Sequence, residues 1–162
     1  MTVGVISDTH GILEPQVLRI FRGVKLILHG GDIGTPAVLR ALEAVAPVRA
    51  VLGNVDDAGS VGRHPAWRVE TVGGVRVYMT HQIGAPGRVL SKVARAVARE
   101  RARVLVFGHS HRAYNAEHDG ILFLNPGGAG PRRFGLPRSV ALLHVLGGAP
   151  KAEIIFLDES GT

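Results

Sequence analysis

Three short aliphatic runs in the first third of the chain, each followed by polar residues, constrain the fold most strongly. They span residues 2–7, 25–28 and 48–52 and have the composition of buried strands. Between them, residues 15–22 and 36–45 carry apolar side chains at helical spacing, with a proline near the start of each segment. This alternation predicts a β-α-β-α-β unit with parallel strands.

The rest of the chain has the pattern of hairpins around one long helix. Residues 67–72 and 75–80 flank Gly73-Gly74, which predicts two antiparallel strands joined by a tight turn. A helix is expected over residues 87–101, where apolar side chains share one face and basic side chains take the other, solvated one. Further strands are expected at residues 104–107, 113–117, 121–124, 139–145 and 152–157.

These elements predict an α/β fold of two packed mixed β-sheets flanked by helices, a four-layer α-β-β-α sandwich. We expect a single domain over residues 1–162, because no repeat and no linker composition interrupts the chain. Apolar runs fall short of the roughly 20 residues that cross a bilayer, and no basic segment with a cleavage site opens the sequence. A cytoplasmic protein without membrane contact is therefore expected.

Composition limits the chemistry that the chain can carry. The sequence contains no cysteine, which excludes disulfides, thiolate metal sites and a cysteine nucleophile. Any metal must then be held by His, Asp, Glu or Asn. The formal net charge of +6 favours an anionic partner such as a nucleotide, a nucleic acid or a phosphorylated metabolite. Nucleic acid is possible but not indicated, because zinc-finger spacing and an aromatic stacking platform are both missing.

Candidate ligands follow the three predicted parallel strands. Asp8 and His10 come after the first, Asp32 after the second and Asn54 after the third. Open α/β sheets place ligands at the carboxyl ends of their strands, so we expect these side chains to meet. The alternative is ordinary turn and cap chemistry, in which Asp8 or Ser7 caps a helix and His10 lies on the surface.

Histidines at two further strand ends extend this set. His81 follows the predicted hairpin, and His109 and His111 follow the strand at 104–107. Residues i and i+2 project to the same side of an extended chain, so the last two can serve one site. His29 could orient a ligand, although a hydrogen-bonded structural histidine is the commoner case. The remaining strand histidines, His118 and His144, have no comparable setting.

The ordered series Asp-x-His, Gly-Asp, Gly-Asn-x-Asp, His and Gly-His-x-His resembles the calcineurin-like metallophosphoesterase superfamily. Within it, the chain is similar to the small bacterial and archaeal phosphodiesterases. This narrower resemblance rests on Ser-Asp-Thr-His-Gly at residues 7–11, His-x-Gly-Asp-Ile at 29–33, Asn-Pro-Gly-Gly at 125–128 and Pro-Arg at 131–132.

The resemblance implies two divalent metal ions. One ion would be held by Asp8, His10, Asp32 and His111, and the other by Asp32, Asn54, His81 and His109, with Asp32 as the bridge. Manganese is expected, with iron, zinc or nickel as alternatives. A metal-bound hydroxide would attack the phosphorus of a small phosphodiester or nucleotide. The candidate catalytic residues are these same seven ligands.

One departure from the family pattern concerns the proton for the leaving group. Many members have a histidine after the motif asparagine, where this chain has Val55, so the general acid is unassigned. Asp56 is interpreted as structuring this turn. Asn54 and Arg132 are the candidate substrate-binding residues, and Arg133 could join them or belong to a solvated basic loop.

Two alternatives to a phosphodiesterase remain. The same metal site could serve a phosphomonoesterase, or the chain could be a scaffold like the retromer subunit of this fold, which works through protein contacts. The presence of all seven candidate ligands favours an enzyme, because a chain released from catalysis need not keep them. The oligomeric state is open, with a homo-oligomer possible.

Overall fold

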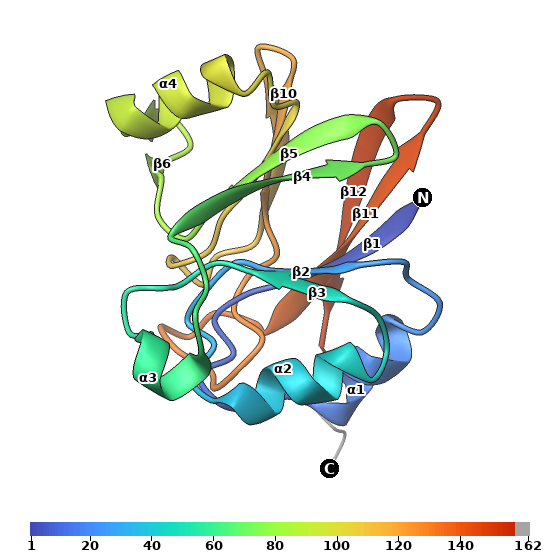
Figure 1. Ribbon diagram of the computed structural model, residues 1–162, viewed down its shortest axis with the longest axis vertical. Helices are drawn as coiled ribbons and strands as arrows, with labels where there is room; N and C mark the ends of the chain where they lie inside the picture. Colours follow the sequence, from blue (N-terminus) through green and yellow to red (C-terminus); the bar gives the residue numbers. More distant parts are fainter. Residues whose placement is uncertain (158–162) are drawn as a thin grey trace.

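The computed structural model describes residues 1–157, which form two five-stranded sheets and a small hairpin (Figure 1). In the first sheet the order is β12 (Ala149–Phe156), β11 (Ser139–Leu146), β1 (Thr2–Ile6), β2 (Ile27–His29) and β3 (Val48–Ala50). In the second it is β4 (Trp67–Val72), β5 (Val75–Thr80), β8 (Val104–Val106), β10 (Ile121–Asn125) and β9 (Tyr114–His118).

Both sheets are mixed. Each has three adjacent parallel strands, which antiparallel strands flank on one side in the first sheet and on both sides in the second. Strands β1, β2 and β3 are parallel, as are β5, β8 and β10, whereas β11, β12, β4 and β9 pair antiparallel with their neighbours. The parallel strands of each sheet deliver their carboxyl ends to one edge of that sheet. The loops that carry the candidate ligands all start there.

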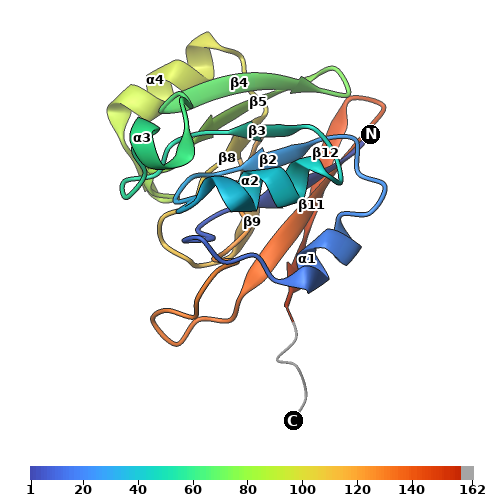
Figure 2. The same cartoon turned by 60° about the horizontal axis from the view of Figure 1, so that its bottom comes forward.

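Three separate apolar clusters define the layers. One lies between the sheets and includes Val5, Val77 and Val106. A second fills the space between the first sheet and helices α1 (Pro15–Ile20) and α2 (Pro36–Glu43). A third joins the second sheet to α4 (Ser91–Arg99), so the helices lie on the outer faces of both sheets (Figures 1 and 2). The predicted α-β-β-α sandwich is confirmed.

Alternation along β1 shows how the sequence builds two of these layers. Val3 and Val5 point into the cluster between the sheets, while Ile6 points toward the helices. Gly4 shares the helix side, where a Cβ atom would lie 2.9 Å from the ring of Phe21. The glycine therefore allows α1 to pack closely against the strand.

The helices depart from the sequence prediction at two places. The helix expected over residues 87–101 begins only at Ser91, because β6 (Gly84–Ala85) pairs with β7 (Arg88–Val89) and the Leu90 N–H donates to the Ile83 carbonyl. A short helix, α3 (Ala58–Val61), was not predicted. Among residues 1–157, no helix combines the length and apolar character that a membrane span requires.

Candidate metal centre

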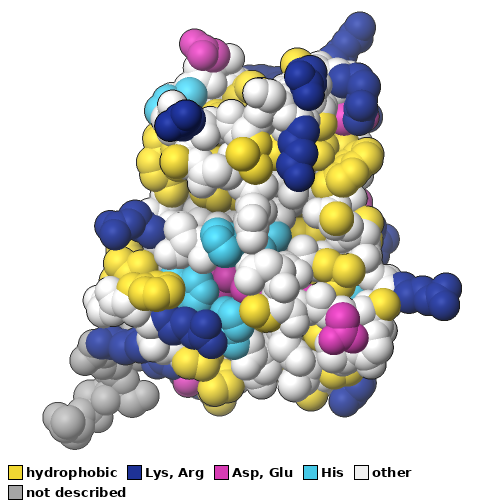
Figure 3. Space-filling model, turned by 90° about the vertical axis from the view of Figure 1, so that its left-hand side faces the viewer, with side chains coloured by type: hydrophobic (Ala, Val, Ile, Leu, Met, Phe, Trp, Pro, Cys, Tyr) yellow, Lys and Arg dark blue, Asp and Glu magenta, His cyan; other side chains and the backbone are white. Residues whose placement is uncertain are grey.

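The seven candidate ligands come from five loops at the carboxyl edge of the two sheets. Figure 3 looks onto this edge and shows histidine side chains grouped around acidic ones in the middle of the face. Asp8, Asp32, His81 and His111 are buried, whereas Asn54 and His109 are exposed. The structure thus brings together all seven residues that the sequence singled out: Asp8, His10, Asp32, Asn54, His81, His109 and His111.

One group of potential ligands contains Asp8, His10 and His111, whose ligand atoms all lie within 4.8 Å of one another. The Asp8 Oδ1 atom is 3.3 Å from His111 Nε2 and 3.9 Å from His10 Nε2. The two imidazole Nε2 atoms are 3.3 Å apart. Three lone-pair atoms therefore converge on one point, which is the arrangement that a divalent cation would stabilise.

A second group contains Asp8, Asp32 and His81. Asp32 Oδ2 lies 3.3 Å from His81 Nε2 and 3.7 Å from His10 Nε2, so this carboxylate stands between the two groups. Asp8 Oδ1 also lies 3.8 Å from His81 Nε2. The central position expected of Asp32 is therefore shared in part by Asp8.

Asn54 links the second group to the exposed His109. Its Oδ1 atom is 3.0 Å from His81 Nε2 and 2.9 Å from His109 Nδ1. On the other side of the ring, His81 Nδ1 lies 2.7 Å from the Gly30 carbonyl. That contact favours a proton on Nδ1, which leaves Nε2 as the atom that can bind a metal.

Asp8 provides an independent test of whether these residues fit a metal ion. Its Oδ1 atom is buried and has no hydrogen-bond partner among residues 1–157. Its Oδ2 atom, by contrast, accepts hydrogen bonds from the Ser7 hydroxyl at 2.7 Å and the His109 N–H at 3.1 Å. A buried carboxylate oxygen without a partner is costly, and a cation at the ligand cluster would remove that cost. The oxygen and nitrogen donors fit divalent metals.

The charges of the site favour ionised carboxylates. Burial alone would raise the pKa of Asp32, but His81 and the Val55 N–H stabilise the carboxylate and lower its pKa to about 2. Burial would also raise the pKa of Asp8, but His111 and His81 stabilise its carboxylate and lower the pKa below its usual value. Both groups are therefore negatively charged at neutral pH and attract cations.

The pKa values of His10 and His81 are shifted in opposite directions. Burial lowers the pKa of His10, and the positive charge of Arg133 lowers it further. Burial opposes protonation of His81 too, but the neighbouring Asp32 and Asp8 carboxylates raise its pKa. A metal ion bound at Nε2 of His81 would compete with a proton for that atom.

Most of the candidate ligands have a left-handed backbone. The φ angles are 54° at Asp8, 46° at His10, 53° at Asp32, 71° at His109 and 58° at His111. Such values are uncommon outside glycine, although Asn, Asp and His adopt them more often than other residues, and they cluster at functional sites, where the surrounding structure maintains them. The residue types permit this conformation, but the sequence alone does not predict it at these positions.

Two glycines and a buried asparagine hold the ligand loops close together. A Cβ at Gly53 would lie 2.0 Å from Asp32 Oδ1, and one at Gly108 would lie 2.1 Å from Ser7 Oγ. Only glycine permits these approaches. Asn125 donates from Nδ2 to the Gly108 carbonyl at 3.1 Å and thereby supports the loop of His109 and His111. The supporting roles of Ser7 and Asn125 were not predicted.

His29 has a structural role. Gly31 N–H donates to its Nδ1 at 3.2 Å, and its Nε2 lies 3.0 Å from Thr9 Oγ1, which donates to the Ile33 carbonyl at 2.9 Å. This series of hydrogen bonds connects the loops after β1 and β2.

The alternative in which Ser7 or Asp8 caps a helix is wrong, because α1 begins only at Pro15.

The other residues singled out in the sequence lie around the site. Asp56 accepts hydrogen bonds from the N–H groups of Ile33, Gly34 and Gly53 and so shapes the loop, as interpreted. Val55 is 56% exposed. Arg132 and Arg133 line a small depression beside His111. His118 and His144 lie on β9 and β11.

Comparison with known proteins identifies the family. Residues 1–148 match the model of the calcineurin-like phosphoesterase superfamily domain. The chain belongs to this superfamily. A probable metallophosphoesterase from Methanothermobacter thermautotrophicus is 35% identical over 160 residues, which are 96% of this chain and 92% of that protein. Phosphodiesterase MJ0936 from Methanocaldococcus jannaschii is 26% identical over 145 residues, 78% of this chain and 83% of that protein.

Solved structures of the superfamily fold include an archaeal phosphodiesterase at a TM-score of 0.77 and 22% identity, covering 96% of this chain and 100% of the other. Vps29 from Chaetomium thermophilum also aligns at 0.77, with 18% identity over 97% and 95% of the two chains. At these identities the likeness shows the fold alone. With the family match, the protein is a phosphoester hydrolase of a metal-dependent superfamily.

Proposed function

We propose that the protein is a phosphodiesterase that uses two divalent metal ions, with manganese as the preferred metal. One ion would be held by Asp8, His10, Asp32 and His111, and the other by Asp32, Asn54, His81 and His109. The substrate would be a small phosphodiester or nucleotide. When bound, two ions would neutralise phosphate oxygens and activate a water molecule for attack on phosphorus.

The observation that carries this proposal is the position of Asp32 between the two halves of the cluster. Its Oδ2 atom lies 3.7 Å from His10 on one side and 3.3 Å from His81 on the other. A carboxylate that lies between two cations can bind both and reduce their mutual repulsion. The unpartnered Oδ1 of Asp8 supports the same arrangement.

The chain's own residues would bind and orient the phosphate. Asn54 and His109, which are exposed while the carboxylates are buried, face the side from which substrate arrives. Arg132 and Arg133, beside His111, would add positive charge for phosphate oxygens. At Val55 the chain offers no proton donor, so the departing oxygen would leave unprotonated or take a proton from water.

Three considerations support a diester over the two alternatives. The relative MJ0936 is named a phosphodiesterase. A phosphate monoester carries an extra negative charge, which the apolar Val55 does nothing to neutralise. The likeness to Vps29 extends to the fold alone. In this chain five of the candidate ligands form two clusters, and Asn54 connects His81 to His109, an arrangement that a scaffold does not require.

A substrate panel tests the proposal. The protein is stripped with chelator, reloaded separately with manganese, iron, zinc or nickel, and assayed on 4-nitrophenyl diesters and monoesters. We expect turnover of diesters only after metal is added, fastest with manganese, and near-complete loss in Asp32→Asn. His144→Ala, on β11 and outside the site, is the matched control and should retain activity. Faster monoester turnover would favour the phosphomonoesterase, and no turnover with any metal would favour the scaffold.

A further inference from the structure

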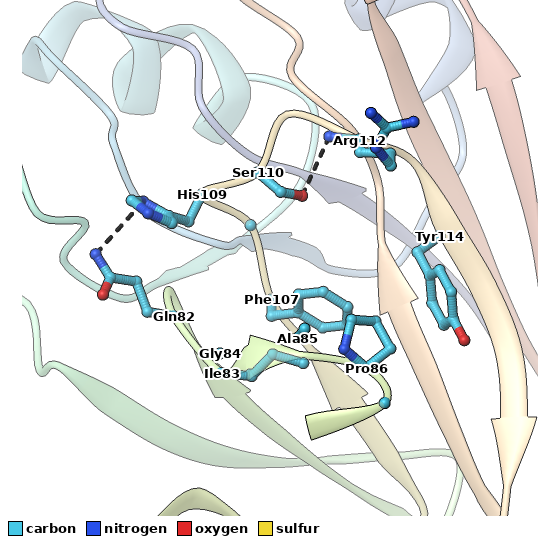
Figure 4. Close-up of a pocket in the computed structure, with 12 residues that line it drawn as sticks. Gln82, Ile83, Gly84, Ala85, Pro86, Phe107, His109, Ser110, Arg112 and Tyr114 are labelled. Carbon is cyan, nitrogen blue, oxygen red and sulfur yellow. Dashed lines mark hydrogen bonds between the residues drawn. The ribbon is translucent and has the colours of Figure 1, made fainter. Parts of the chain in front are cut away.

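A cavity of about 430 Å³ opens beside the metal centre, and His109 is the one candidate ligand among the residues that line it. Its lining includes Ile83 and Pro86, at and just before the β6–β7 hairpin, and the rings of Phe107 and Tyr114 (Figure 4). Gln82, Ser110 and Arg112 add polar groups. The volume lies in the range of small-ligand pockets, which are mostly apolar with a few polar groups.

The cavity adjoins the metal centre at His109. This residue lines the cavity, while its Nδ1 atom is 2.9 Å from Asn54 Oδ1. Gln82 Nε2 lies 3.4 Å from the same ring nitrogen, as the dashed line in Figure 4 shows. Gly108, also in the lining, donates its N–H to the carbonyl of His81. A phosphate at the ligand cluster would thus have its substituents next to the cavity mouth.

The lining suits a flat apolar group. The centroids of the Phe107 and Tyr114 rings are 6.4 Å apart and their planes are inclined by 49°, so the two rings contact each other and form one aromatic surface at the cavity. Burial of apolar area is the main gain for a ligand here, and aromatic partners add to it by stacked or edge contacts. A methyl group would leave most of the cavity to water.

We propose that this cavity binds one organic substituent of the phosphodiester and selects aromatic or heteroaromatic groups, such as a nucleobase, over small alkyl groups. The inference rests on the proposed function for the position of the phosphate. It adds a source of substrate selectivity that bound metal ions could not provide, because the ions would contact only the phosphate group.

Direct titration calorimetry with two phosphonates tests the inference. Methylphosphonate and 1-naphthylphosphonate carry the same anionic group and one substituent each, and neither is hydrolysed. For the manganese-loaded protein we expect 1-naphthylphosphonate to bind at least about tenfold more tightly, since a single methylene in an apolar pocket already changes discrimination by about 10- to 200-fold. Equal dissociation constants would overturn the proposal.

Two variants locate the binding site. Gly87 lines the cavity, and Gly87→Phe should narrow it. The position tolerates a side chain, because a Cβ at Gly87 would meet no described residue within 4 Å and its φ lies outside the left-handed region. Tyr114→Ala removes one wall and covers the case in which the first variant does not fold. Each should reduce the naphthyl preference to about threefold or less and leave methylphosphonate binding unchanged. Phe156→Ala, on the exposed part of β12, is the control and should keep the full preference.

The outcomes separate this inference from the proposed function. A naphthyl preference that survives in both Gly87→Phe and Tyr114→Ala would place the aromatic group elsewhere and refute the cavity proposal. If these variants abolish the naphthyl preference but the wild type hydrolyses no phosphoester, the result would support the cavity proposal and contradict the proposed phosphodiesterase function. Diester hydrolysis without any naphthyl preference would contradict the cavity alone.

Discussion

His29 should make the metal-free protein sensitive to mild acid. The side chain is fully buried, and burial lowers its pKa from 6.5 to about 4. Its Nδ1 accepts the Gly31 N–H, so a proton added at that atom would face another N–H group. The native state therefore holds His29 neutral down to about pH 4, whereas the unfolded chain takes up a proton below about pH 6.5.

The magnitude follows from proton linkage. Between pH 6.5 and about 4 the unfolded state binds one more proton than the native state, so the free energy of unfolding falls as the pH drops. One unit of pKa difference corresponds to about 1.4 kcal/mol, which gives a loss of about 3 kcal/mol over this window. Above pH 6.5 His29 contributes no pH dependence, because it is neutral in both states.

Urea denaturation of chelator-stripped protein measures this effect. His29→Asn keeps an acceptor near the Gly31 N–H but does not titrate, so other acid-sensitive groups cancel when the two proteins are compared. The wild type should lose about 3 kcal/mol more than the variant between pH 7 and pH 4, and the difference between them should be constant from pH 7 to pH 8. Equal losses in both proteins would refute the assignment of His29 as a buried neutral link between the ligand loops.

Three further predictions concern metal, leaving group and loop structure. Removal of metal that was present at about a hundredfold excess over Kd should lower the free energy of unfolding by about 2.7 kcal/mol and the Tm by about 5 to 10 °C, and added manganese should restore both. An unchanged Tm in verified metal-free protein would contradict a native metal site. With Val55 in place of a proton donor, log kcat/KM should fall steeply with the pKa of the leaving group, and Val55→His should make that slope shallower; a shallow slope in the wild type would mean that another residue donates the proton. Asp56→Ala leaves three backbone N–H groups without their acceptor and should lower the free energy of unfolding, measured with urea, by about 3 kcal/mol. The control Asp57→Ala removes the N-cap of α3 and should lower it by about 1 kcal/mol. Equal losses would show that Asp56 does not hold the loop.

The sequence predicted the layered fold because each layer has a local signature. The aliphatic runs before Asp8, Asp32 and Asn54 become parallel strands, of which the first two are buried and the third is a partly exposed edge strand. The Pro-led segments become α1 and α2. The helix predicted over residues 87–101 begins four residues late, at Ser91, because of contacts that the local sequence does not show. Val89 and Leu90 continue the apolar face of the helix, but the pairing of β6 with β7 uses their backbone instead. Asp57 and Ser60 form a capping box that could have indicated α3, although a helix of one turn gives little apolar periodicity.

The identity of the candidate ligands was predictable, whereas their support was not. Polar residues at the carboxyl ends of parallel strands follow a general rule of α/β sheets, and these side chains do converge. The left-handed backbone at His109 and His111 and the shared position of Asp8 depend on contacts between loops distant in sequence. The cavity beside His109 has the same origin, since Ile83, Phe107 and Tyr114 come together only when the second sheet forms.

The number of metal ions per chain tests the central claim most directly. Elemental analysis of the protein saturated with manganese and freed of excess metal should give two ions per chain in the wild type and in the control His144→Ala. In Asp32→Asn both sites should weaken, because one carboxylate lies between the two ligand groups, and the count should fall below one with near-complete loss of diester turnover. A wild type that holds a single tightly bound ion per chain at saturation would contradict the dinuclear centre.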